Sequence, residues 1–524
     1  MAITLDVQFY CFLFFTWLAS TLLVRSLAKK SLKSKRVFQY PPSPRALPII
    51  GHLHLLSSVL PKSFQTLALR HGPLMRLSLG KSTAIVVSNS TTAKEFLKTH
   101  EMNFVSRPAF GASDFDIYKD SKFVNAEYGA YWRFMKKVCM TELLAGTTLI
   151  RFTDIRKEEM VKLLNILSRC SEDGRDCDVG REIMTMTNNV ICRMAMSTRC
   201  SRNADEGKEI WGLVKGILDV APKFSLGEML GPLVKYDLFG YGRELTSLMM
   251  KFDRMVEGIM MEHEKEREIG GEKESKDMMD ILLEIHVDEN SEVKLSRDDI
   301  KSFLMEMFMA GTETISVAMQ WTLAEIVNHP DVFKKVREEI NEVVGSNRLV
   351  QESDVPNLPY LQAVVKESLR LHAPAPLIFR KCKEDCKING YDITSNERII
   401  FNVYAIMRDP EAWGNDAHAF VPDRFLASSM DDGDQQQMVG FMGGREYSFL
   451  PFGSGRRGCP GASLASVVMH AAIGALVQCF DFKVKGGEKL DLIEGPGLSS
   501  GMAHPLLCYP ITHVNPLKLT TVSG

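Results

Sequence analysis

A single cysteine, set in a loop rich in glycine and proline just before a long apolar stretch, constrains this chain more than any other feature. The loop reads PFGSGRRGCPG over residues 451–461, and the following stretch, GASLASVVMHAAIGALVQC, is a predicted apolar helix. Glycine allows positive φ and a close backbone approach to a flat ligand, while proline restricts its neighbours. The helix dipole and exposed amides favour a thiolate just before a helix start. Cys459 is therefore a candidate thiolate ligand; a buried cysteine in a glycine turn would not account for the two adjacent arginines.

The rest of the chain is predicted to be mainly α-helical with a smaller β portion. Alternation of apolar and polar residues over 74–89, broken at Gly80, predicts a β-hairpin. Two highly charged loops, residues 264–277 and 427–437, do not separate stretches with the look of independent cores. We therefore expect one large catalytic unit over residues 51–524. Long amphipathic stretches predict helices over residues 213–220, 245–268, 298–328 and 331–344.

An apolar segment near the start of the sequence predicts a membrane anchor. Residues 7–24 are mostly apolar, and as a helix they would span about 27 Å of the ~30 Å hydrocarbon core. Lysines and arginines crowd residues 25–36, so the positive-inside rule keeps the following chain in the cytosol. A cleaved signal peptide is the alternative, but its charge would precede the apolar run. We expect a single-pass anchor over residues 1–25 and a basic, proline-rich hinge over residues 26–50.

The charge distribution supports a membrane lipid as a partner of the N-terminal part. Between Val7 and Lys94 there are twelve Lys and Arg and no Asp or Glu, although the whole chain has a net charge of only −2. Such a basic beginning fits a position beside anionic headgroups. No nucleic-acid-binding motif accompanies it, so we expect no nucleic-acid partner. The eleven cysteines are scattered rather than regularly spaced, which fits a reducing compartment.

The cysteine loop also carries a family resemblance. FGSGRRGCPG resembles the haem-binding signature F-x-x-G-x-R-x-C-x-G of the cytochrome P450 family. The resemblance implies a haem-thiolate monooxygenase fold, mainly α with a smaller β portion. It implies that Cys459 is the axial ligand of the iron of haem b and that Arg457 pairs with a haem propionate. The matching positions are Phe452, Gly455, Arg457, Cys459 and Gly461.

Two further segments resemble the family's propionate-binding positions. WRFMKK, residues 132–137, is similar to the element W-x-x-x-R, with Lys136 in place of the usual arginine. Trp132 and Lys136 are four residues apart and share a helix face, so an indole donor and a cation could meet one propionate. Arg380, after HAPAPLIF, matches the remaining position. The alternatives are an interfacial tryptophan and an ordinary strand arginine.

A Glu-Arg-Arg cluster is implied by KESLR and PDRF. Glu367 and Arg370 stand three residues apart and share a helix face. Alone, such a pair would be read as a surface ion pair. In the family the glutamate, this arginine and the arginine that matches Arg424 form a buried structural cluster, so we expect that role here, although Asp423 replaces the commoner glutamate.

Oxygen chemistry is predicted from MFMAGTETIS, residues 307–316, within a long apolar helix. Gly311 in mid-helix costs roughly 1 kcal/mol relative to alanine, and Thr314 can bond back to a carbonyl, so we expect a local distortion. The segment resembles the family's oxygen-binding element A/G-G-x-D/E-T-T/S. By that resemblance Ala310 and Gly311 leave room above the iron, while Glu313 and Thr314 organise proton delivery. The alternative is a core helix with a tolerated glycine and threonine.

These matches imply an NADPH- and O2-dependent monooxygenase. No dinucleotide-binding or flavin motif is present, so the electrons are expected from an NADPH-cytochrome reductase that docks on the basic cysteine-side surface. Together with the anchor, this places the catalytic domain on the cytosolic side of the endoplasmic reticulum membrane. The alternatives from other functional classes are a haem-thiolate isomerase or dehydratase and a non-catalytic haem sensor.

The substrate is expected to be a lipophilic plant specialised metabolite. The segments that resemble variable recognition regions are rich in Met, Leu and Phe and hold no convergent pair of charges. The chain resembles plant microsomal members near the groups that oxidise triterpenoids and (iso)flavonoids. NNVICRM and NVYAIMRDP favour a pentacyclic triterpenoid of the β-amyrin or friedelin type, hydroxylated on a methyl group or oxidised on to the acid; (iso)flavonoid oxidation, as by a flavone synthase or flavanone hydroxylase, is the alternative. The recognition segments are residues 107–131, 213–230, 303–310, 375–379 and 497–504.

Overall fold

The structure is a computed structural model of the chain. It describes residues 38–520 except 81, 109–114, 119–120, 198–211, 221–236, 238, 270–275, 427–446, 488 and 498, together with residues 16, 20 and 21. The predicted anchor over residues 1–25, the first part of the hinge, and the charged loop at 427–437 lie almost wholly outside the described residues.

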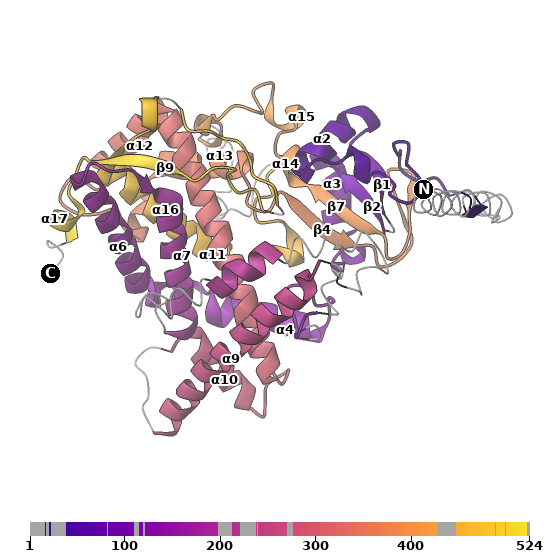
Figure 1. Ribbon diagram of the computed structural model, residues 1–524, viewed down its shortest axis with the longest axis horizontal. Coiled ribbons are helices and arrows are strands. Elements are labelled where there is room, and N and C mark those ends of the chain that lie inside the picture. The colour runs from indigo at the N-terminus through magenta and orange to yellow at the C-terminus, as the bar shows by residue number, and fades with distance from the viewer. Residues whose placement is uncertain are drawn as a thin grey trace, which may run out of the picture.

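The described part of the chain is mainly helical with a smaller β portion, as predicted (Figure 1). All four predicted helices keep their positions to within about four residues at either end, and the one predicted over 213–220 is formed by residues 212–220. The helices are α2 (Leu60–His71), α3 (Ser90–Lys94), α4 (Ala130–Val138), α5 (Gly146–Arg151), α6 (Thr153–Glu172), α7 (Val179–Met196), α9 (Tyr241–Glu268), α10 (Met278–Val287), α11 (Arg297–Asn328), α12 (Pro330–Val343), α13 (Pro359–Leu371), α14 (Val403–Ile406), α15 (Pro410–Trp413), α16 (Ala462–Cys479) and α17 (Pro516–Thr520).

The largest described sheet has four strands in the order β1-β2-β7-β4 and lies beside α2 and α3, apart from most of the helices (Figure 1). The predicted hairpin is confirmed, because β1 and β2 pair antiparallel with Leu74 opposite Val87. The strands are β1 (Leu74–Leu79), β2 (Ser82–Val87), β3 (Cys177–Asp178), β4 (Leu377–Lys381), β5 (Cys386–Ile388), β6 (Tyr391–Ile393), β7 (Arg398–Asn402), β8 (Phe480–Lys483) and β9 (Leu507–Thr512). A second sheet has the order β3-β9-β8, and β5 pairs with β6.

Helix α11 runs through the helical part of the molecule and packs along α7 (Figure 1). Its start is fixed by a capping box in which Ser296 and Asp299 exchange hydrogen bonds between side chain and backbone. The predicted distortion near Gly311 was wrong, since α11 is continuous from Arg297 to Asn328. A side chain at Gly311 would place its Cβ 2.8 Å from Cδ1 of Ile191. Close packing of α11 on α7 therefore explains this glycine without a break in the helix.

One described helix, α16, is long and apolar enough to cross a membrane. Most of its side chains are buried, however, and it packs against α11, α12 and α13. We therefore assign α16 to the protein core.

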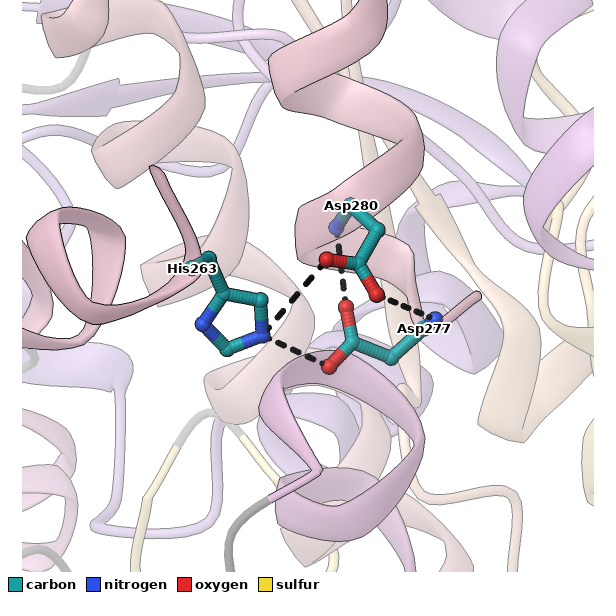
Figure 2. A group of neighbouring side chains, drawn as sticks. All are labelled: His263, Asp277 and Asp280. Carbon is teal, nitrogen blue, oxygen red and sulfur yellow. Dashed lines mark hydrogen bonds and ion pairs between the residues drawn. The ribbon is translucent and has the colours of Figure 1, made fainter. Parts of the chain in front are cut away.

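A buried polar cluster joins the ends of three helices (Figure 2). His263 of α9 has one ring nitrogen 3.0 Å from the carbonyl oxygen of Ile259 and the other 2.9 Å from the Asp277 carboxylate. Asp277 caps α10, exchanges hydrogen bonds with Asp280, and accepts a third from Ser197 at the end of α7. In the described part of the chain, His263, Asp277 and Asp280 are the group whose ligand atoms lie close enough together to hold a metal ion. Because these side chains bond to one another, to the Ile259 carbonyl and to the Ser197 hydroxyl, we assign the cluster to helix packing.

Candidate active site

The Cys459 loop is held tightly against the start of α16. The Cys459 N–H donates to the carbonyl oxygen of Phe452 over 2.9 Å, and Gly455 has a φ of 61°, in the left-handed region that favours glycine. The half-buried ring of Phe452 packs against the main core. The backbone N–H of Arg456 donates a hydrogen bond to the Glu101 carboxylate over 2.7 Å, which ties the loop to the segment around Glu101. The thiol is thus presented on a fixed backbone.

The surroundings of the Cys459 thiol shift its pKa in opposite directions. Burial raises its pKa, whereas the backbone N–H of Gly461 and the charges of Lys136 and Arg107 lower it. Only the thiolate binds a metal. The Gly461 N–H and the two cations are therefore the groups that favour the ligating thiolate.

Three arginines gather near this loop from separate segments. Arg457 donates to the carbonyl oxygens of Val105 and Ala126, and its guanidinium carbon lies 4.3 Å from the centre of the Trp132 ring. Arg380 on β4 is buried, and desolvation together with repulsion from Arg107 and Arg457 lowers its pKa to about 9.

This arginine group fits the carboxylates of a haem. Arg380 is only 3% exposed, and the one hydrogen bond of its side chain within the described residues runs to the carbonyl oxygen of Phe379. A buried guanidinium beside two like charges needs an anion. The propionates would supply it, with Arg380 and Arg457 as donors. Arg107 belongs to the same group but was not predicted as a site residue, because the sequence placed it only in a variable segment.

Trp132 and Lys136 both lie at this site, on one face of α4. Trp132 is buried beneath Arg457, and its ring stacks on that of Phe123. Lys136 donates over 2.7 Å to the carbonyl oxygen of Gly458, next to the thiol. Both predicted propionate ligands are therefore beside the cysteine loop, and in this structure the lysine contacts backbone.

The predicted oxygen-binding residues lie on a less buried stretch of α11. Ala310 is exposed and Thr314 half-buried, although most of the helix is buried. The Thr314 hydroxyl donates over 2.5 Å to the carbonyl oxygen of Ala310, as expected. Glu313 accepts a 2.8 Å hydrogen bond from Ser499, and burial raises the pKa of its carboxyl group.

Glu306, one turn before Ala310, was not predicted from the sequence as a site residue. Its carboxylate accepts hydrogen bonds from the backbone N–H groups of Phe123 and Val124, and burial raises its pKa to about 7. It thereby holds a recognition segment against α11. The mid-helix acid among apolar residues was a signal that could have found it.

The three residues predicted to form a buried cluster are together. Glu367 receives two hydrogen bonds from Arg370, at 2.7 and 2.8 Å, and one from Arg424 at 2.9 Å. Neither Glu367 nor Arg370 is exposed. Arg370 also donates to three carbonyl oxygens, those of Met407, Ala417 and Ala419, so it fastens the chain on both sides of α15 to α13.

The recognition segments contain both buried and half-buried apolar residues. Phe303, Met305 and Leu377 are buried and belong to the core. Five further apolar side chains of these segments are half-buried: Met307, Met309, Ile378, Phe379 and Met502.

The half-buried Cys459 thiol before a core helix, the buried arginines beside it and the threonine of α11 fit a haem-thiolate site. The family model described as Cytochrome P450 matches residues 41–508. Two soybean (Glycine max) relatives match almost the whole chain. The 3,9-dihydroxypterocarpan 6A-monooxygenase is 42% identical and covers 94% of this chain and 96% of its own. The beta-amyrin 24-hydroxylase is 41% identical and covers 98% and 99%.

A solved structure supports the same fold. A zebrafish cytochrome P450 determined with abiraterone has a TM-score of 0.71 at 24% identity, over 86% of this chain and 99% of its own. The chain belongs to the cytochrome P450 family. It is a haem-thiolate monooxygenase that receives electrons from a partner reductase, and its relatives are plant enzymes.

Proposed function

We propose that this enzyme oxidises a pentacyclic triterpenoid of the β-amyrin or friedelin type on a methyl group, with further oxidation to the acid as an extension. The observation that carries the proposal is the apolar character of five half-buried side chains in the expected recognition segments: Met307, Met309, Ile378, Phe379 and Met502. Side chains of this kind suit a large hydrocarbon skeleton, because a substrate rich in hydroxyl groups would lose hydrogen bonds against them. The 41% identity to a beta-amyrin 24-hydroxylase supports the same class.

The second candidate is an (iso)flavonoid or related pterocarpan. It is favoured by the 42% identity to a 3,9-dihydroxypterocarpan 6A-monooxygenase. Expression with a plant reductase in yeast that makes β-amyrin or friedelin, with parallel feeding of flavanones and pterocarpans, decides between the two. Oxidised triterpene without flavonoid product supports the first proposal, and the reverse pattern overturns it. Incorporation of labelled oxygen from ¹⁸O2 separates oxygenation from isomerisation or dehydration.

The residue roles that we propose follow the site. Bound haem supplies the activation of O2. Cys459 would hold the iron, while Arg380, Arg457, Trp132 and Lys136 would surround the propionates, with Phe452 as an apolar wall and Gly455 and Gly461 allowing the backbone to approach. Ala310 and Gly311 would leave space above the haem face. Thr314 and Glu313 would hold and pass protons: the threonine hydroxyl is fixed to its own helix, and the burial of Glu313 favours the protonated form.

We also propose the membrane arrangement that the sequence predicts, with an anchor over residues 1–25, a hinge over 26–50 and a cytosolic catalytic domain over 51–524 at the endoplasmic reticulum. The basic run after the apolar segment supports it. Microsomes from cells that express the full chain provide the test. Resistance to carbonate extraction, with the catalytic domain open to added protease, is the expected result. Release of the chain by carbonate would refute the anchor.

A further inference from the structure

The tip of a C-terminal hairpin is bonded to α11 through two successive residues. Residues 494 and 502 form a β-bridge, and the Gly495 N–H donates to the carbonyl oxygen of Gly501 over 2.8 Å. At the tip, the Ser499 hydroxyl donates over 2.8 Å to Oε1 of Glu313. The next residue, Ser500, accepts a 2.5 Å hydrogen bond from the indole N–H of Trp321.

The backbone of this tip is held independently of the Ser499 side chain. Trp321 is fully buried and lies flat on the His372 ring, with centroids 4.1 Å apart and planes 4° apart. His372 is itself bonded to Glu325 over 2.7 Å. The Ser500 N–H also donates to the carbonyl oxygen of Pro374. Loss of the Ser499 hydroxyl alone should therefore leave the hairpin in place.

Glu313 has an unusual setting for a carboxyl group. Burial is the main influence on its pKa and raises it, the charge of Asp219 on the helix over residues 212–220 raises it further, and the Ser499 hydrogen bond lowers it. No cation forms an ion pair with Glu313 among the described residues. Thr314, the next residue, gives its hydroxyl proton to the carbonyl oxygen of Ala310. Ser499 is thus the described side chain that orients the Glu313 carboxyl group.

We propose that Ser499 is a positioning residue that fixes the Glu313 carboxyl group beside Thr314 and thereby governs the delivery of protons during oxygenation. The proposal rests on the role proposed above for Glu313 and adds a partner from the far end of the chain. When the hydroxyl is absent, the carboxyl group rotates freely and is harder to ionise. Two electrons from NADPH and two protons should then convert O2 to hydrogen peroxide, which is released, and the substrate is not oxygenated.

The test compares Ser499→Ala, Ser499→Thr, Glu313→Gln and the double variant Ser499→Ala/Glu313→Gln, each as the haem-loaded full chain with a plant reductase. The probe is β-amyrin, and the readouts are hydrogen peroxide formed per NADPH consumed and, without turnover, the urea midpoint of unfolding, each measured across a pH series. That ratio is defined whether or not β-amyrin is converted. Ser499→Ala should raise the ratio about two- to tenfold, the range of one lost hydrogen bond. It should also shift the pH profile to higher pH, because the hydrogen bond that lowers the Glu313 pKa is gone.

Ser499→Thr retains the hydroxyl and should restore both the ratio and the pH profile. In the Glu313→Gln background, Ser499→Ala should add nothing, because the two residues act as one unit. An equal effect of Ser499→Ala with and without Glu313 would overturn the proposal and show a general disturbance of the hairpin. An unchanged ratio and pH profile in Ser499→Ala would overturn it as well. If Glu313→Gln itself behaves as the parent enzyme, the proposed role of Glu313 fails first.

Discussion

The ammonium nitrogen of Lys136 lies 2.7 Å from the carbonyl oxygen of Gly458, the residue that precedes Cys459. Its charge lowers the pKa of the Cys459 thiol, against the larger effect of burial. Lysine at this position therefore stabilises both the conformation of the loop and the thiolate, whereas the sequence predicted only contact with a propionate.

Replacement of Lys136 by methionine should lower the fraction of Cys459 present as thiolate. Without the charge, the thiol pKa rises, and a smaller fraction of the reduced, CO-treated protein should show the absorption band of a thiolate-ligated haem. Lys136→Arg keeps the charge and should behave as the parent enzyme. Spectra recorded over a pH series provide the measurement, and equal thiolate fractions in all three proteins would contradict it.

The Glu367 cluster should be essential for folding rather than for substrate choice. Glu367→Gln leaves the fully buried charge of Arg370 without its carboxylate, at a cost of roughly 3 to 5 kcal/mol, whereas Arg424 keeps its second partner Asp416. Asp423→Asn is the matched control, because Asp423 pairs with Lys335 over 3.4 Å in an exposed position and such pairs contribute about 1 kcal/mol or less. Urea unfolding and haem content measure both. A mild Glu367→Gln phenotype would mean that this site tolerates unpaired charge.

Local patterns predicted those parts of the site that are read along one segment. The spacing of Glu367 and Arg370 on a single helix, and the back-bond of Thr314 to Ala310, depend on helical geometry alone, so the sequence contained them. The hairpin at 74–89 follows in the same way from alternation and a glycine turn.

The rest of the site depends on packing between distant segments. Arg107 can be identified as a site residue only because folding brings it beside Arg380 and Arg457. Ser499 can be identified only because the C-terminal hairpin reaches Glu313. Gly311 shows a different difficulty, since both an oxygen site and tight contact with Ile191 select the same residue. Periodicity and motif matches hold no information on such contacts.

Glu306 should make stability depend on pH near neutrality. Burial raises its pKa to about 7, while the N–H groups of Val124 and Phe123 and the charges of Lys122 and Arg107 lower it. The folded protein therefore binds this proton more tightly than the unfolded chain does. The contribution of Glu306 to stability falls as pH rises from about 5 to about 7 and is constant above. In Glu306→Gln this decrease should disappear, as urea midpoints at several pH values would reveal; an unchanged slope would contradict the assignment.

Gly311 offers a test between packing and space above the haem. Its Cβ would meet Ile191 at 2.8 Å, so Gly311→Ala should overpack the α7–α11 contact and destabilise the protein by about 1 to 3 kcal/mol. Ile191→Val removes the nearest methyl group and should recover part of that loss in the double variant. Gly258→Ala on α9 is the control: a Cβ there has no neighbour within 4 Å, so alanine should stabilise the helix by up to about 1 kcal/mol. Urea unfolding and haem content are measured for all four proteins. Normal stability of Gly311→Ala with reduced haem content would instead show that the glycine leaves space for the haem.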